Sequence, residues 1–134
     1  MSNAALHHKI TYIEFTTTDI EKSQSFYEKA FGWNFQSFGL DYVSFDKSSA
    51  GIDGGFRRGE PGQSTPNPAA PLIVLYSQDL KATEQAVLAA GGEIVVATFE
   101  FPGGRRFHFS DGAGNTLAVW SEWRRCPSGG PSAS

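Results

Sequence analysis

The sequence of 134 residues contains a single cysteine, Cys126, which stands close to the C-terminal end. One cysteine cannot form an intramolecular disulfide, and one thiolate is too few for the cysteine-rich zinc sites of small domains. No apolar run approaches the roughly 20 residues that cross a bilayer, so we expect no membrane partner. The first residues, MSNAALHHK, also contain no apolar stretch of the kind found in secretory signals. We therefore expect a cytoplasmic protein.

Positive charge is scarce as well. Lysine and arginine together number 11 against 14 aspartates and glutamates, which gives a net charge of −3. Proteins that bind nucleic acids or anionic membrane surfaces usually carry a basic surplus, so we expect neither as a partner. Aromatic residues, in contrast, make up 13% of the chain and include eleven phenylalanines. This content predicts a core or a cavity lined by rings.

Proline and glycine concentrate in one internal segment, RGEPGQSTPNPAAP, which spans residues 58–71. Such a segment cannot form a regular helix or strand, so we interpret it as a linker between residues 9–57 and 72–123. Both parts belong to one domain of residues 9–123, since a chain of this length forms a single ordinary core. Residues 1–8 are expected to be flexible, and the tail of residues 124–134 to be disordered.

The two parts repeat one pattern. Each begins with a β-rich run, ITYIEFTTTD or LIVLYSQD, continues with a helical pattern, and ends with three short β-rich segments. The aspartates that close the first runs, Asp19 and Asp79, stand 60 positions apart, and so do Gly32 and Gly92 at the predicted helix ends. Equal offsets at both ends indicate an internal repeat. The pattern predicts an α+β fold of two βαβββ modules, which form a curved, partly open mixed-sheet barrel around a cleft.

The predicted helix ends have recognisable capping residues. Thr18 and Glu21 fit a capping box at the start of the first helix. Gly32 and Gly92 stand where a left-handed residue commonly ends a helix.

Three segments resemble a known family. DIEKSQSFYEKAFGW is similar to the first helix of the vicinal oxygen chelate superfamily, AAGGEIVV to the strand after its second helix, and FSDGAGNTLAVW to its last hairpin. This superfamily holds glyoxalases, extradiol dioxygenases and bleomycin resistance proteins. The three motifs occur in the family's order, and the resemblance covers residues 9–123.

The resemblance implies a divalent metal held by four inward residues, usually His or Glu, one from each of four strands. The corresponding positions here are Tyr12, Leu72, Ala118 and a fourth position near Asp53. Aliphatic side chains offer no lone pair, and a protonated tyrosine is a poor ligand for these ions. We therefore predict no metal at this site and no cofactor.

The resemblance also places one face of the first strand in the cleft. Alternation along a strand puts Tyr12 and Glu14 on the same face. The predicted ligand-binding residues are Tyr12, Glu14, Leu72, Ala118 and Trp120.

Two residues are candidates for acid–base chemistry. Glu14 on an apolar strand is a candidate general base or an anchor for a cation, with its pKa raised by the cleft. The alternatives are an exposed glutamate or one that is paired with an arginine. His108 is a candidate acid–base partner of Glu14, and the alternative is a histidine that only makes structural hydrogen bonds.

The predicted function is that of a glyoxalase/bleomycin-resistance-like protein that binds a small aromatic or cationic molecule without the usual metal. The alternative is a lyase, isomerase or dioxygenase of the same superfamily, with relocated metal ligands or with metal-free acid–base chemistry at Glu14 or His108. A standard lactoylglutathione lyase is not expected. Half-open sheets leave edges that a second copy would cover, so we expect a homodimer with Trp33 and Trp123 as candidate contacts.

Overall fold

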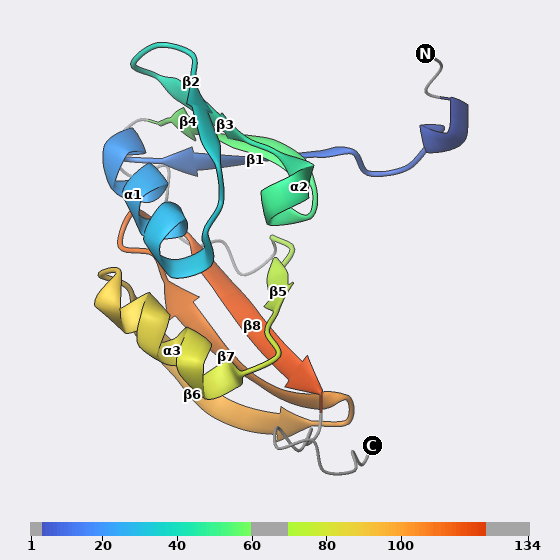
Figure 1. Cartoon of the computed structure of the whole chain (residues 1–134), viewed down its shortest axis with the longest axis vertical. Helices are drawn as coiled ribbons and strands as arrows, with labels where there is room; N and C mark the ends of the chain where they lie inside the picture. The colour runs from blue at the N-terminus through green and yellow to red at the C-terminus, as the bar shows by residue number, and fades with distance from the viewer. Residues whose placement is uncertain (1–3, 60–69, 123–134) are drawn as a thin grey trace.

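The computed structural model describes residues 4–59 and 70–122 of the chain (Figure 1). In chain order the elements are the 3-10 turn Ala4–Leu6, β1 Tyr12–Thr17, α1 Ile20–Phe31, β2 Phe35–Ser37, β3 Tyr42–Phe45, α2 Lys47–Ala50, β4 Asp53–Arg58, β5 Val74–Tyr76, α3 Leu80–Ala89, β6 Glu93–Phe101, β7 Gly104–Ser110 and β8 Thr116–Glu122. None of the described helices has the length and apolar character needed to cross a membrane.

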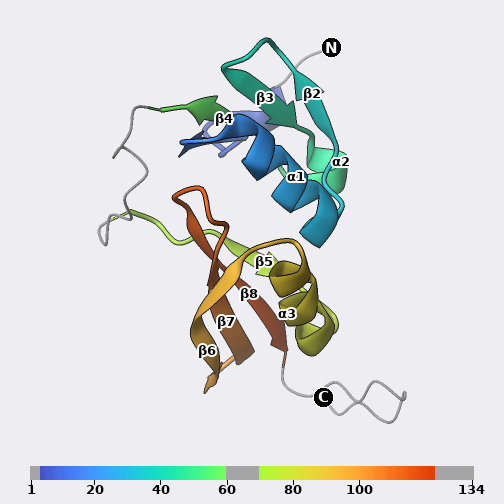
Figure 2. The ribbon, with the colours of Figure 1, turned by 90° about the vertical axis from the view of Figure 1, so that its left-hand side faces the viewer.

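The strands form two separate four-stranded sheets with the same topology. Their orders are β1-β4-β3-β2 and β5-β8-β7-β6, with β1–β4 and β5–β8 parallel and the other pairs antiparallel. The predicted α+β class with two βαβββ modules is therefore confirmed, and the two sheets are not closed into one another (Figure 2). The short helix α2, which the sequence analysis did not predict, is an insertion between β3 and β4.

The two long helices begin in the same way. The side chain of Asp19 accepts a hydrogen bond from the Lys22 amide at 3.0 Å, and Asp79 does the same for the Ala82 amide at 3.2 Å. The predicted capping box of Thr18 and Glu21 is wrong, because Asp19 itself is the N-cap and satisfies the free amide of the first turn.

The helix ends differ between the modules. Gly32 follows α1 with φ of 72°, as predicted. In the second module the left-handed residue is Gly91, with φ of 103°, so the prediction for Gly92 is wrong by one position. Gly92 is needed for another reason, since a side chain there would overlap the ring of Phe26 and the carbonyl oxygen of Ser110.

The aromatic core lies between the two sheets and is centred on α1. Phe26 packs against Phe109 of the second sheet, with ring centroids 5.8 Å apart, and Tyr27 packs against Phe56 of the first sheet at 5.1 Å. Figure 2 shows α1 beneath the first sheet, facing the second module. The phenylalanines thus fill a shared core, and each sheet keeps one face that the helices do not cover.

Trp33 belongs to this core. Its side chain is only 7% exposed and stacks on Tyr27 with ring centroids 4.8 Å apart. Trp33 is therefore not a dimer contact, which corrects the expectation from the sequence. Trp123, the other candidate contact, lies outside the described residues.

The turn between β7 and β8 fastens the second module to the first. The carboxylate of Asp111 accepts hydrogen bonds from the amides of Ala113 and Asn115, at 2.8 and 3.1 Å, and from the hydroxyl of Tyr27 at 2.9 Å. The side-chain amide of Asn115 donates to the carbonyl of Thr16 at 3.0 Å. Burial raises the pKa of Asp111, although the hydrogen bonds it accepts act in the opposite direction.

We expect Asp111→Ala to destabilise the protein by about 3 kcal/mol, because it leaves the buried Tyr27 hydroxyl and two turn amides without their acceptor. Asp111→Asn keeps one acceptor oxygen and should cost less. Denaturant unfolding at several pH values checks this. A raised pKa in the folded state means that the Asp111 contribution to stability is complete below the usual aspartate pKa and decreases as the pH rises through the folded value. The free energy of unfolding of Asp111→Asn, relative to wild type, should therefore improve as the pH rises from the usual aspartate pKa through the raised pKa of Asp111 in the folded protein. If the difference in stability between Asp111→Asn and wild type stays the same across this pH range, the raised pKa of Asp111 is contradicted.

Candidate functional site

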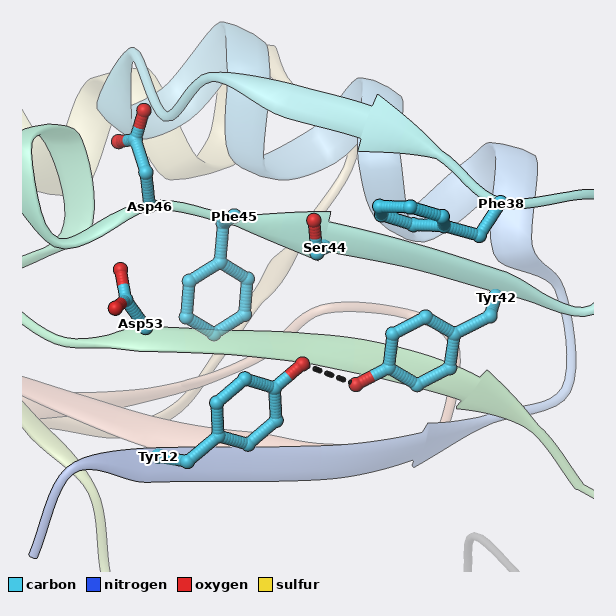
Figure 3. A pocket seen from close by; sticks show the side chains of 7 residues that line it. All are labelled: Tyr12, Phe38, Tyr42, Ser44, Phe45, Asp46 and Asp53. Atoms are coloured by element: carbon cyan, nitrogen blue, oxygen red, sulfur yellow. Dashed lines mark hydrogen bonds between the residues drawn. The ribbon is translucent and has the colours of Figure 1, made fainter.

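Two tyrosines meet on the uncovered face of the first sheet. Tyr12 of β1 and Tyr42 of β3 approach each other across β4, and their hydroxyl oxygens lie 2.5 Å apart (Figure 3). The intervening strand carries Gly55 at this point, and any side chain there would overlap the Tyr42 hydroxyl. The absence of a side chain on β4 is therefore what allows the two phenols to join.

Glu14 completes this tyrosine pair. The Tyr42 hydroxyl donates to one Glu14 carboxylate oxygen at 3.2 Å, and the Nε of Arg57 lies 3.3 Å from the other. Arg57 also donates to the hydroxyl of Thr16 at 3.0 Å. Desolvation raises the pKa of Tyr42, and its hydrogen bond to Tyr12 adds to the effect. The Tyr42 phenol is therefore protonated at neutral pH and donates a hydrogen bond.

The surroundings of Glu14 differ from those expected. Its side chain is 45% exposed and paired with Arg57, so the structure agrees with the alternative of a glutamate paired with an arginine and not with a desolvated carboxylate on an apolar wall. The face alternation was correct, since Tyr12 and Glu14 lie on the open side of β1 while Phe15 stacks on Phe56 in the core. The sequence alone could not show that Arg57 would reach Glu14, because their proximity depends on the parallel pairing of β1 with β4.

A hollow of about 480 Å³ lies beside the tyrosine pair. Figure 3 shows the aromatic and acidic side chains around it, which come from the first module alone. The carboxylate of Asp53 accepts from the amide of Lys47 at 2.8 Å, and Asp46 accepts from the amide of Ser49 at 3.0 Å. These hydrogen bonds to Ser49 lower the pKa of Asp46. The lining residues are Tyr12, Phe38, Tyr42, Ser44, Phe45, Asp46 and Asp53.

The other predicted ligand-binding residues belong to the second module. Ala118 and Trp120 lie on the uncovered face of the second sheet, where Ala118 is fully buried and Trp120 packs edge-on against Tyr76 at 5.2 Å. Leu72 precedes β5 and is 38% exposed. His108 is the cross-strand neighbour of Ala118 on the same face.

Within one chain, these two groups of residues lie on different sheets. Tyr12 and Glu14 belong to the first sheet, and Ala118 and Trp120 to the second. A second hollow, of about 610 Å³, does adjoin both modules, but residues of β1, β5 and the segment around α2 form most of its wall, and it is lined by none of the predicted ligand-binding residues. The ligand-binding set predicted for one cleft is therefore divided between two faces.

The residues at the family's metal positions do not fit a divalent ion. In the pairing register Glu14 lies opposite Gly55 and Val74 lies opposite Ala118. Glu14 stands five positions before Asp19, the N-cap of α1, and Val74 stands five positions before Asp79, the N-cap of α3, so the two residues are equivalent in the repeat. The first-module counterpart of Ala118 is therefore Gly55 and not Asp53. The four positions thus offer two aliphatic side chains, a glycine and the Tyr12 phenol, which already bonds to Tyr42. Nowhere in residues 4–59 and 70–122 do three or more His, Cys, Asp or Glu side chains gather as a metal site.

Sequence reasoning missed Tyr42, Arg57 and Gly55. The segment DYVSFD does alternate, which would have placed Tyr42 and Ser44 on one face of a strand. Which strand stands between Tyr42 and Tyr12 depends on the sheet order, and no local pattern contains that information.

Comparisons with known proteins agree with this fold. Residues 9–119 match the family described as Glyoxalase/Bleomycin resistance protein/Dioxygenase superfamily. A glyoxylase-like domain-containing protein of Didymella fabae is 30% identical over 123 residues, which cover 85% of this chain and 94% of that protein.

Solved structures show the same architecture. A glyoxalase-related enzyme from Fulvimarina pelagi superposes with a TM-score of 0.71 at 17% identity, over 86% of this chain and 88% of that one. TnmS3 from Streptomyces sp. CB03234, described as an antibiotic binding protein, gives 0.62 at 19% identity, over 84% and 94%. The family match over residues 9–119 and the 30% identical relative show that the chain belongs to the glyoxalase/bleomycin resistance protein/dioxygenase superfamily.

Proposed function

We propose that this protein binds a small organic cation with an aromatic or apolar part, without a metal ion, in the hollow beside Tyr12. The observation that carries the proposal is the composition of that hollow. Four aromatic side chains and two carboxylates line a space of about 480 Å³, which is within the usual size range of small-molecule sites.

The chemistry of the lining favours a positive charge. Cations bind over the faces of aromatic rings, which Tyr12, Phe38 and Tyr42 supply. The carboxylates of Asp46 and Asp53 add negative charge, and the hydrogen bonds they accept come from backbone amides and serine hydroxyls. Among the described residues neither carboxylate has a salt-bridge partner, so a cationic ligand would supply one.

The role we propose for Glu14 is to position Tyr42. Its carboxylate accepts the Tyr42 hydroxyl and neutralises Arg57, which would otherwise place an unpaired positive charge beside the site. Binding, as described for the related TnmS3, fits this arrangement better than turnover. The catalytic roles of Glu14 and His108, and a cytoplasmic location, stay predictions.

We further propose that the protein acts as a homodimer. The strands β1 and β5 are edge strands of their sheets, and β5 carries Val74 and Tyr76 with 41% and 53% of their side chains exposed. A second copy would cover these edges and would bring the first sheet of one chain beside the second sheet of the other. The two faces that one chain keeps apart would then line one cleft.

Glu14→Gln should weaken binding of benzyltrimethylammonium several-fold, because Tyr42 loses its charged acceptor. Its free energy of unfolding should change by less than about 1 kcal/mol, since exposed ion pairs contribute little. Asp53→Asn should weaken binding as well, through loss of charge in the hollow. Calorimetric titration measures the affinities, and Asp41→Asn is the matched control, because Asp41 pairs with Arg58 outside the hollow. Equal losses in Asp41→Asn and Asp53→Asn, or equal affinity for neutral benzyl alcohol, would disprove the site.

Metal analysis of the purified protein should find no stoichiometric divalent ion after dialysis against a chelator, because the family positions hold no suitable ligand set. Reconstitution with Ni²⁺, Zn²⁺, Mn²⁺ or Fe²⁺ followed by a second dialysis repeats the test. A retained ion that is lost in Asp53→Ala would overturn the prediction.

Sedimentation velocity at micromolar concentration should show a species of twice the chain mass. Tyr76→Glu places a charge on the exposed edge strand β5 and should shift the equilibrium toward monomer, whereas Leu88→Glu, on the exposed side of α3, should leave it unchanged. A wild-type species of monomer mass would reject the dimer.

A further inference from the structure

One row of side chains crosses the uncovered face of the second sheet. Phe99 of β6, Arg106 of β7, Trp120 of β8 and Tyr76 of β5 are successive cross-strand neighbours. The row is therefore three rings and one guanidinium. The row lies on the second sheet and shares no residue with the cation-binding hollow of the first module, so separate substitutions test the two.

Arg106 is held between two rings. Its guanidinium carbon lies 5.3 Å from the centroid of Phe99 and 5.4 Å from that of Phe101. Among the described residues no carboxylate pairs with it, and Glu122, the acid on the same face, accepts the Tyr76 hydroxyl. A fixed cation therefore stands on an aromatic surface without an ion-pair partner from the described part of the chain.

His108 stands next to Arg106 on this face, two residues along β7. Its ring centroid is 5.9 Å from that of Phe99, and its cross-strand neighbour is Ala118, whose methyl group is fully buried. Burial lowers the pKa of His108, and the charge of Arg106 lowers it further. The imidazole is accordingly neutral at physiological pH, and its Nε2 donates or accepts a hydrogen bond according to the tautomer.

The two side chains share an unusual property. The Nε of Arg106 and the Nε2 of His108 are the buried side-chain nitrogens that lack a hydrogen-bond partner within residues 4–59 and 70–122. Buried polar atoms in native proteins nearly always have a hydrogen-bond partner. Because these two nitrogens lack one at successive positions of the same face, a molecule from outside the chain would supply the missing hydrogen bonds. Both side chains pack on Phe99, which follows an irregularity in the pairing of the edge strand β6.

We propose that this face binds the acidic group of a planar aromatic molecule, with its carboxylate or phenolate on Arg106 and His108 and its ring against Trp120. An anion supplies acceptors for the arginine and for the Nε2–H tautomer of the histidine, and such charge-assisted hydrogen bonds are strong and directional. An organic cation, which suits the hollow of the first module, is repelled here.

Titration of the full-length protein with 2-naphthoate tests this proposal, with 2-naphthamide as the neutral control. We expect naphthoate to bind and Arg106→Gln to weaken it about tenfold or more, as for a lost charge-assisted hydrogen bond. His108→Phe should weaken it several-fold. Arg105→Gln is the matched control, because Arg105 is exposed on the opposite face of the same strand and should leave the affinity unchanged.

A measurement on the wild-type protein covers the case in which a variant fails to fold. Nitrogen–proton spectra of the histidine rings should show the His108 signals move with naphthoate but not with naphthamide, while those of His7 and His8 stay in place. Equal binding of the amide, equal losses in Arg105→Gln and Arg106→Gln, or an unmoved His108 signal would overturn the proposal. Because this probe is opposite in charge to benzyltrimethylammonium, failure here leaves the test of the Glu14 hollow unaffected.

Discussion

The buried carboxylate of Asp111 is the contact on which the arrangement of the two modules depends. It shapes the β7–β8 turn through two amides and binds the Tyr27 hydroxyl of the first module. Tyr27 also stacks on Trp33 and packs on Phe56, so one side chain links the turn to the core of the first sheet. Desolvation makes this carboxylate costly to ionise, and the three hydrogen bonds offset that cost.

Because the modules meet through α1 and this turn, their uncovered sheet faces do not share one space within a chain. The two faces also differ in chemistry. The first carries tyrosines and carboxylates around a hollow, and the second carries Arg106 and His108 among aromatic rings. The repeated backbone thus presents different side-chain chemistry on the uncovered faces of its two copies.

A very small residue stands at the centre of each uncovered face, Gly55 in the first sheet and Ala118 in the second. Gly55 lets Tyr12 and Tyr42 join across β4, and Ala118, its counterpart in the second module, is the cross-strand neighbour of His108. These are the positions at which metal-binding relatives would need a ligand. In this chain Gly55 has no side chain and Ala118 has only a methyl group, and at Gly55 the Tyr42 hydroxyl occupies the space that a side chain would take.

Local patterns in the sequence determined the modules, the repeat that places Asp19 and Asp79 before the two long helices, and the alternation that puts Tyr12 and Glu14 on one face, because these depend on residues close together in the chain. Composition and residue type also sufficed to predict that Leu72 and Ala118 cannot hold a metal. Only the tertiary structure decided that Arg57 neutralises Glu14, that Tyr42 meets Tyr12, and that Trp33 is buried. Each of these contacts joins residues from different elements, and sheet order and helix packing set their distances. The sequence carries that information only through the whole fold.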